Sequence, residues 1–143
     1  IVGITRGTNK YHIIRATLES IAYQVCDVAD AMKADSGIDL RTLKVDGGAS
    51  ANDLLMQFQA DMLNKPVNRP SCVESTGMGA SFLAGLATGF WKNKEELLRT
   101  ITLDRVFIPN MDEEERNKKR KGWNKAVKYA YGWAKDNEDE EEE

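Results

Sequence analysis

The sequence predicts an α/β fold in which several helices cover a short sheet, and three observations support this. Segments with the composition of strands alternate with amphipathic helical segments, an order typical of layered α/β proteins. Of the 143 residues, 41% are hydrophobic and 30% charged, so one packed domain is possible. The predicted strands are few and short, so apolar helix faces would remain uncovered. We therefore expect that strands preceding Ile1 are missing from this chain.

A long helix is predicted first. Residues 1–5 have the composition of the end of a strand, and Thr8 or Asn9 can cap the helix that follows. Hydrophobic spacings of three and four predict that the helix runs to about Ala34, and Gly37 suits the left-handed position after its end. Its predicted apolar stripe comprises Ile14, Leu18, Ile21, Val25, Val28 and Met32.

Shorter elements follow. Residues 42–45 and 66–68 are predicted strands, and a helix over residues 51–63 separates them. Its predicted inward residues are Leu54, Leu55, Phe58 and Met62. A third helix, rich in small residues, is expected to be capped by residues 74–76 and closed by Gly89.

Two further helices are indicated by capping boxes, in which an N-terminal Asn or Asp is followed three residues later by Glu. One helix runs from Asn93 to about Thr100, and the other begins at Asp112. The apolar stripe of this last helix comprises Trp123, Val127, Ala130 and Ala134. Residues 1–135 form the expected lobe, and the acidic residues 136–143 are expected to be a disordered tail.

Charge and composition exclude several functional classes. A net charge of −3 does not indicate a nucleic-acid surface, and no apolar run reaches the length of a membrane span. We find no signal peptide and expect a cytoplasmic protein, because Cys26 and Cys72 form no disulfide framework. Cys26 is expected in the core, and one histidine with two separated cysteines makes no zinc cluster.

The sharpest local pattern is the strand-to-helix turn at residues 45–52. Gly47 and Gly48 let a ligand lie against bare backbone, and the following helix offers unpaired amides to a polar or anionic group. Asn52, expected one turn into the helix, supplies both a donor and an acceptor. These three residues are therefore the candidate ligand-binding residues. A tight turn without a ligand is the alternative interpretation.

Other residues favour structural roles. Asp46 is interpreted as a turn cap rather than a ribose or metal-water ligand. Residues 76–80 are expected to pack closely on the sheet rather than form a second wall of a nucleotide cleft. His12 is interpreted as a surface or capping residue, and residues 116–121 as a solvated helix face. Trp91, Trp123 and Trp133 are expected to be packing anchors. No catalytic residue and no metal ligand is assigned.

Several stretches of the sequence resemble the last lobe of the glycerol kinase family. They are Ile4-Thr5-Arg6-Gly7-Thr8, His12-Ile13-Ile14-Arg15-Ala16-Thr17-Leu18-Glu19, Val45-Asp46-Gly47-Gly48-Ala49 with Asn52, Leu55-Met56-Gln57-Phe58-Gln59-Ala60-Asp61, and Gly89-Phe90-Trp91. The resemblance covers nearly the whole chain apart from the acidic tail. Met78 and Ser81-Phe82 stand where Leu and Ala-Tyr are commoner, and neither departure touches a candidate nucleotide-binding residue.

This resemblance implies a two-lobed actin-like, ribonuclease-H-like ATPase fold. It also implies transfer of a phosphoryl group from Mg-ATP to glycerol, giving glycerol 3-phosphate. Gly47, Gly48 and Asn52 would form the adenosine-binding wall for ATP or ADP. Glycerol contacts, Mg²⁺ ligands and the catalytic base would lie outside this chain, which would then be inactive alone. The whole enzyme is expected to be a homo-oligomer with no nucleic-acid partner and no membrane span.

Three alternatives remain open. The chain could belong to another carbohydrate kinase of the same superfamily, in which case glycerol is the wrong substrate. It could be a non-catalytic nucleotide sensor or actin-like interaction module. It could also be a structural fragment whose exposed helix faces form an oligomer surface.

Overall fold

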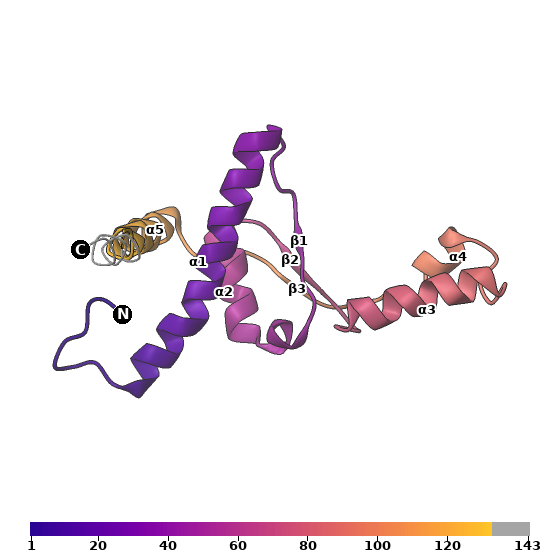
Figure 1. Cartoon of the computed structure of the whole chain (residues 1–143), viewed down its shortest axis with the longest axis horizontal. Coiled ribbons are helices and arrows are strands. Elements are labelled where there is room, and N and C mark those ends of the chain that lie inside the picture. The colour runs from indigo at the N-terminus through magenta and orange to yellow at the C-terminus, as the bar shows by residue number, and fades with distance from the viewer. Residues whose placement is uncertain (133–143) are drawn as a thin grey trace, which may run out of the picture.

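The computed structural model describes residues 1–132, and in these the α/β class is confirmed. The elements in chain order are α1 (Lys10–Ser36), β1 (Leu43–Lys44), the 3₁₀ turn η1 (Gly48–Ala51), α2 (Asp53–Leu63), β2 (Val67–Pro70), α3 (Ser75–Ala87), α4 (Lys94–Leu98), β3 (Leu103–Phe107) and α5 (Glu113–Lys128). Figure 1 shows α1 and α2 beside the sheet, α5 beyond α1, and α3 with α4 as an arm extending away.

The sheet has the order β1-β2-β3 among the described residues. β1 runs parallel to β2, with Leu43 opposite Val67, and β2 runs antiparallel to β3, with Val67 opposite Phe107. The strands predicted over residues 42–45 and 66–68 are confirmed as β1 and β2, with ends that differ by one or two residues. β3 was not predicted, because most of its residues are exposed and give no apolar face.

The strand predicted over residues 1–5 is wrong. This segment is irregular, and Ile1, Val2 and Ile4 are exposed. A strand needs a neighbour to satisfy its backbone amides and carbonyls, and no described strand lies beside this segment.

The core lies where α1 and α2 meet the sheet. Its buried hydrophobic cluster comprises Ala22, Cys26, Leu55, Met56, Phe58, Ala60, Met62, Val67 and Phe107. The core position predicted for Cys26 is confirmed, and burial raises the pKa of its thiol to about 11. The core is therefore built mainly from α2, with contributions from the middle of α1 and from two strands.

The ends of α1 follow the local sequence signals. The Asn9 side chain accepts hydrogen bonds from the Tyr11 and His12 amides, and Gly37 has φ +70° in the left-handed region, as predicted. The predicted apolar stripe is wrong, however, since most of its members face solvent. Instead, the small side chains of Ala22 and Cys26 pack inward, because they allow α2 to approach closely.

α2 confirms three of its four predicted inward residues. Leu55, Phe58 and Met62 are buried, whereas Leu54 is 57% exposed. The side chain of Asn52 caps α2 by accepting a hydrogen bond from the Leu55 amide over 3.0 Å. This cap begins α2 after η1, so the helix starts two residues later than predicted.

α5 packs across α1 through an aromatic and polar contact. The Trp123 ring stacks on Tyr23 at 5.2 Å between centroids, and its indole nitrogen donates to Asp27 over 2.7 Å. Arg120 forms an ion pair with Asp30. Lys119 lies over the Phe58 ring at 5.6 Å.

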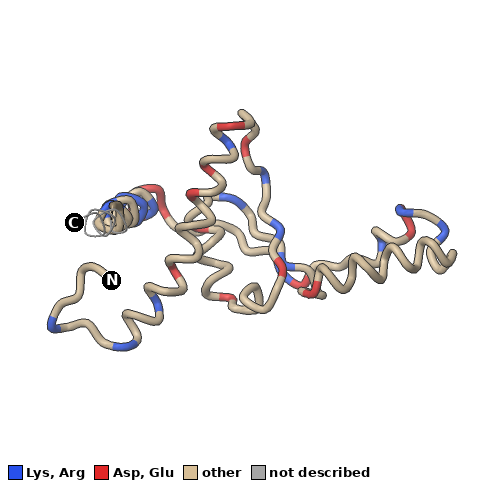
Figure 2. The backbone as a smooth tube through the Cα atoms, in the orientation of Figure 1, with Lys and Arg blue, Asp and Glu red and all other residues tan. Residues whose placement is uncertain are grey.

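The anchor role of Trp123 is therefore confirmed. The solvated face predicted for residues 116–121 is wrong in part, because Arg116, Lys119 and Arg120 are each partly buried. Figure 2 shows that basic residues are frequent along α5. Arg120 pairs with a carboxylate of α1, and Lys119 lies over an aromatic ring of α2. These contacts leave both side chains partly buried.

The arm formed by α3 and α4 packs mainly on itself. A Cβ atom at Gly85 would come within 2.2 Å of the Trp91 ring, and Trp91 also meets Phe82 edge-to-face at 5.6 Å. Asn93 caps α4 by accepting a hydrogen bond from Glu96, as predicted. α3 itself begins at Glu74 without the side-chain cap that was expected.

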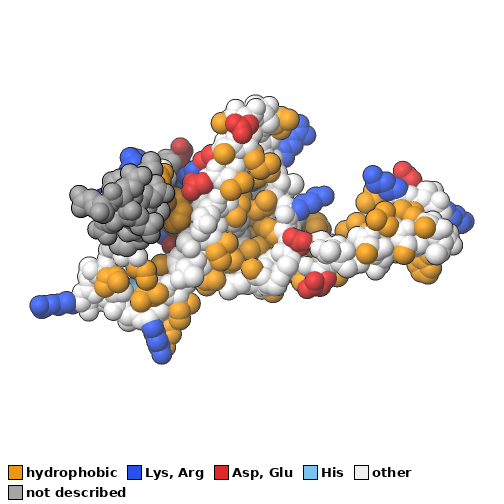
Figure 3. All heavy atoms as spheres, in the orientation of Figure 1, with side chains coloured by type: hydrophobic (Ala, Val, Ile, Leu, Met, Phe, Trp, Pro, Cys, Tyr) orange, Lys and Arg blue, Asp and Glu red, His pale blue; other side chains and the backbone are white. Residues whose placement is uncertain are grey.

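The close packing of α3 on the sheet is also wrong for the described residues. No residue of α3 is buried, and a Cβ at Gly77 or Gly79 would meet nothing within 4 Å. The chain leaves the sheet after β2, and α3 extends away from the sheet on which it was expected to pack (Figure 1). Figure 3 shows hydrophobic side chains at the surface of this arm and beside α1.

Three predictions fall outside the described residues: the anchor role of Trp133, the inward position of Ala134 and the disorder of residues 136–143. Among residues 1–132, no helix combines the length and the hydrophobicity needed to cross a bilayer.

Candidate functional site

The predicted glycine turn is tied to two neighbouring segments. At the end of β1, the Val45 amide donates to the Asn68 carbonyl of β2 over 3.1 Å. The Gly47 amide then donates to the Val73 carbonyl over 2.7 Å, which brings the loop before α3 against the turn. Gly47 has φ +77°, a conformation that L side chains rarely adopt. Glycine is therefore required here by the backbone alone.

The turn closes on itself through Ser50. Both the amide and the hydroxyl of Ser50 donate to the Gly47 carbonyl, over 3.0 and 2.7 Å. Ser50 is buried, while the neighbouring Gly48 is exposed, and a Cβ atom on Gly48 would meet nothing within 4 Å. The buried serine holds the turn from inside, and the outer side presents bare backbone at Gly48.

Asn52 lies at the end of the turn, as the N-cap of α2 rather than one turn into the helix. Its backbone amide donates to the Ala49 carbonyl over 3.2 Å, and its side-chain oxygen accepts from Leu55. The cap engages one end of the side-chain amide. The amide nitrogen has two further donors, which can bind an acceptor on a ligand.

A charged network that the sequence analysis missed stands behind this turn. Arg69 of β2 donates through Nη1 to the Ser50 carbonyl over 2.9 Å and to Asp53 over 2.8 Å. Through Nε it also donates to Asp104 of β3 over 2.7 Å. Arg105 of β3 pairs with the second oxygen of Asp53 over 2.6 Å. No local pattern could reveal this network, because its members come from four separate segments.

Electrostatics favours the charged form of Arg69. The hydrogen bonds that Arg69 donates to Asp53 and then to Asp104 raise the pKa of Arg69 above its ordinary value. The Arg69 and Arg105 guanidinium groups lie 5.2 and 4.7 Å from the centre of the Phe107 ring, within cation–π distance. Asp104, Arg69, Asp53 and Arg105 thus form a chain beside the turn in which negative and positive charges alternate.

Two other predicted residues have distinct outcomes. The Asp46 side chain is exposed and makes no hydrogen bond within residues 1–132, so its interpretation as a turn cap is wrong there. The capping role of His12 is confirmed, because its Nδ1 accepts a hydrogen bond from the Asn9 amide over 3.2 Å.

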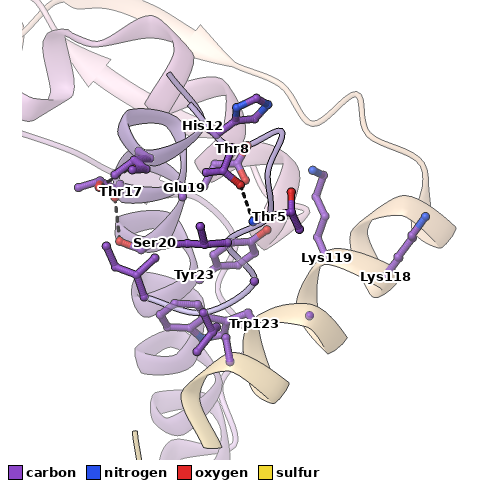
Figure 4. A pocket seen from close by; sticks show the side chains of 18 of the residues that line it. Thr5, Thr8, His12, Thr17, Glu19, Ser20, Tyr23, Lys118, Lys119 and Trp123 are labelled. Carbon is purple, nitrogen blue, oxygen red and sulfur yellow. Dashed lines mark hydrogen bonds between the residues drawn. The ribbon is translucent and has the colours of Figure 1, made fainter. Parts of the chain in front are cut away.

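A separate groove lies away from the turn. An open groove of about 1230 Å³ runs between residues 1–8, the first half of α1 and α5 (Figure 4). Tyr23 and Trp123 form part of its wall, and burial raises the pKa of Tyr23 to about 12. None of the candidate ligand-binding residues lines this groove. Its lining combines apolar residues of the N-terminal segment with acidic and basic residues of α5, such as Glu115 and Lys119.

Metal binding by the described residues is not supported. Within residues 1–132, no group of three or more His, Cys, Asp or Glu side chains is placed to hold a metal ion. The candidate site is thus a turn that presents backbone at Gly48 and the side-chain amide of Asn52.

Comparison with known proteins identifies the family of the chain. Residues 1–88 match the model of the FGGY family of carbohydrate kinases, C-terminal domain. The chain is 65% identical to a glycerol kinase of Agathobacter rectalis over 136 residues, which are 95% of this chain and 27% of that protein. It is 62% identical to a glycerol kinase of Aeromonas hydrophila over 95% of this chain and 27% of that protein. The chain thus spans about a quarter of the length of these relatives.

Solved structures agree with the sequence comparison. The crystal structure of Plasmodium falciparum glycerol kinase with ADP matches with a TM-score of 0.78 and 38% identity, over 91% of this chain and 26% of that chain. A ligand-bound xylulose kinase from Lactobacillus acidophilus matches with a TM-score of 0.69 and 25% identity, over 92% of this chain and 27% of that chain. The fold is that of the actin-like ATPase class, as expected. This chain belongs to the FGGY family of carbohydrate kinases.

Proposed function

We propose that this chain is the C-terminal nucleotide-binding part of a kinase that transfers a phosphoryl group from ATP to glycerol. The observation that carries the proposal is the turn from Gly47 to Asn52, which lies between β1 and α2 and exposes Gly48 and Asn52. The relatives of the chain support glycerol as the substrate, because the identity to a glycerol kinase reaches 65%, against 25% to the xylulose kinase.

The turn would hold the adenosine end of the nucleotide. The bare backbone of Gly48 leaves room for a flat base or a ribose to lie against it. The amide nitrogen of Asn52 would donate to an acceptor of the nucleoside, while its oxygen keeps the helix cap. Gly47 contributes by its φ of +77°, which sets the direction of the turn. The named Plasmodium falciparum structure, with ADP, supports a nucleotide as the ligand.

Positioning is the contribution of these residues to the reaction. Phosphoryl transfer depends on placing the nucleotide, the acceptor hydroxyl and the compensating charges together. The turn can bind and orient one end of ATP. No three described His, Cys, Asp or Glu side chains gather to hold a metal ion, and we assign to these residues no step that involves the metal.

The rest of the machinery is proposed to lie in other parts of a longer protein. Residues 1–135 would form an incomplete lobe, and glycerol, the metal ions and the catalytic base would be held elsewhere. The chain would then be inactive alone. We further propose a cytoplasmic homo-oligomer: the two free cysteines suit a reducing compartment, and exposed apolar side chains such as Leu83 and Phe90 offer contact area.

The test separates the two ends of the Asn52 side chain, in the complete kinase that carries this chain. Asn52→Asp keeps an oxygen for the Leu55 amide but removes the amide donor. We expect the KM for ATP to rise about tenfold, with the KM for glycerol unchanged and the thermal midpoint preserved. Asn52→Ala removes both contacts and should also lower the thermal midpoint.

The matched control is Lys65→Ala, which removes an ion pair with Asp39 away from the turn. It should leave both KM values unchanged. An Asn52→Asp enzyme with the wild-type KM for ATP would contradict the assigned site. A wild-type enzyme that phosphorylates xylulose in preference to glycerol would contradict the assigned substrate.

A further inference from the structure

We infer that Arg69 is a positioning residue for nucleotide binding, which acts by holding the turn formed by residues 47–52. The inference rests on the proposed function, because it concerns the same site. Arg69 does not belong to the turn and would not touch the nucleotide. It reaches the turn from β2, and its contacts fall on both sides of Asn52.

The contacts are placed to fix the turn. Nη1 of Arg69 donates to the Ser50 carbonyl within η1 over 2.9 Å, and to the Asp53 carboxylate at the start of α2 over 2.8 Å. Ser50 itself binds the Gly47 carbonyl. One guanidinium nitrogen therefore bridges the residues two before and one after Asn52.

Arg69 is itself held firmly. Its side chain is 12% exposed, and its Nε and Nη2 both contact Asp104 of β3, each over 2.7 Å. The guanidinium also lies over the Phe107 ring. All three nitrogens of the guanidinium group thus have partners. Arg69 therefore links the sheet, through Asp104, to the turn, through Ser50 and Asp53. Lysine could keep the charge but not these divergent contacts.

This arrangement predicts a specific defect. Without Arg69, the turn should open more often, and the Gly48 backbone and Asn52 amide should lose their fixed spacing. Binding of the nucleotide would then include the cost of ordering the turn. The chemical step should change little once ATP is bound, because the groups that carry it lie elsewhere in the proposal.

The experiment uses the complete kinase and two readouts. The first is hydrogen exchange of the peptide covering residues 46–55, measured without ligand. Arg69→Ala should speed exchange there by about tenfold or more. Arg69→Lys should fall closer to Arg69→Ala than to the wild type. The matched control is Arg120→Ala, which removes a partly buried ion pair with Asp30 between α5 and α1 and should leave this peptide unchanged.

The second readout is the kinetics of the same variants. Arg69→Ala should raise the KM for ATP about tenfold, with kcat and the KM for glycerol changed less than twofold. Arg120→Ala should keep all three constants. A merely structural role for Arg69 would instead lower the amount of active enzyme and leave the KM for ATP unchanged.

Each outcome bears on the inference. Faster exchange together with a raised KM for ATP supports it. Unchanged exchange overturns it, and so does faster exchange with an unchanged KM for ATP. Equal behaviour of Arg69→Lys and the wild type overturns the argument from geometry. If the wild type does not use ATP, the proposed function fails and this inference fails with it, and the exchange data still show separately whether Arg69 holds the turn.

Discussion

The helices α2 and α3 are both short and apolar, yet they have opposite environments. Seven of the eleven residues of α2 are buried, whereas none of the thirteen residues of α3 is. α2 lies between α1 and the sheet, and α3 extends away from them (Figure 1). Hydrophobicity alone therefore does not determine burial in this chain. A helix is buried where the described residues provide a surface to receive it.

The difference extends to how the two helices begin. The side chain of the N-cap residue Asn52 caps α2, and Ser50 and Asp53 on either side of it bind Arg69. α3 starts at Glu74 with no side-chain cap. The packed helix thus has its N-terminus held by the Asn52 cap and by two contacts of Arg69, and the candidate ligand-binding residues lie at that end. We expect the following experiments to show the same contrast.

The largest expected effect compares two truncations to alanine. Met62 in α2 is 2% exposed, and Leu83 in α3 is 72% exposed. Met62→Ala should lower the free energy of unfolding by about 2–5 kcal/mol, because it leaves a cavity in the core. Leu83→Ala should change it by less than about 0.5 kcal/mol. Urea unfolding followed by circular dichroism measures both, and equal losses would show that α3 is covered in solution.

Thiol labelling gives the next contrast. Cys26 is buried in α1, and Cys72 is exposed in the loop before α3. A pKa of about 11 leaves roughly a thousandth of the Cys26 thiol ionised at pH 8. A thiol reagent should therefore label the folded protein once and the urea-unfolded protein twice. The Cys72→Ser variant serves as the control and should show almost no labelling before unfolding. Rapid double labelling of the folded protein would contradict the packed position of α1.

A pair of glycine substitutions tests the internal packing of the arm. Gly85→Ala places a Cβ atom within 2.2 Å of the Trp91 ring, so the ring must move. We expect a loss of about 1 kcal/mol in the stability of the arm and a changed Trp91 signal in fluorine NMR. Gly79→Ala meets nothing within 4 Å and should instead stabilise α3 by about 0.5–1 kcal/mol. A Trp91 signal that is unchanged in Gly85→Ala would show that Gly85 and Trp91 do not pack against each other.

The smallest expected effect is at low pH. Asp39 accepts hydrogen bonds from Lys65 and Lys33, which lower its pKa to about 2. A carboxyl whose pKa is lowered on folding stabilises the protein above its unfolded pKa of about 3.9, and this contribution is lost as the pH falls. The wild type should therefore be slightly more stable than Asp39→Asn at pH 5. Thermal unfolding should show the difference shrinking between about pH 4 and pH 2, and a difference that is independent of pH would contradict this.

The sequence predicted what local interactions determine. The caps at Asn9, Asn93 and Asp112 lie where they were expected, because each bonds an amide two or three residues away. The sequence-based predictions were wrong where contacts with distant segments determine which residues are buried. The stripe of α1 was misplaced because the approach of α2 selects Ala22 and Cys26, and no pattern within α1 encodes that choice.

The candidate site shows the same division. Gly47 was found because its turn requires a left-handed residue, and the structure has that conformation. The role of Asn52 as a cap was missed because the helix was predicted to begin two residues too early, which placed Asn52 inside it. Arg69 was missed entirely, since its partners Ser50, Asp53 and Asp104 lie between 16 and 35 residues away along the chain. The ligand of the turn stays a prediction.

The most direct test of the central claim is a crystal structure of the complete kinase with Mg-ADP. The proposal predicts that the adenosine lies against the backbone of Gly48, with the Asn52 side-chain amide within hydrogen-bonding distance of the nucleoside. It also predicts that Arg69 keeps its contacts with Ser50 and Asp53. Adenosine bound elsewhere, with the turn empty, would contradict the assignment of this turn as the nucleotide-binding site.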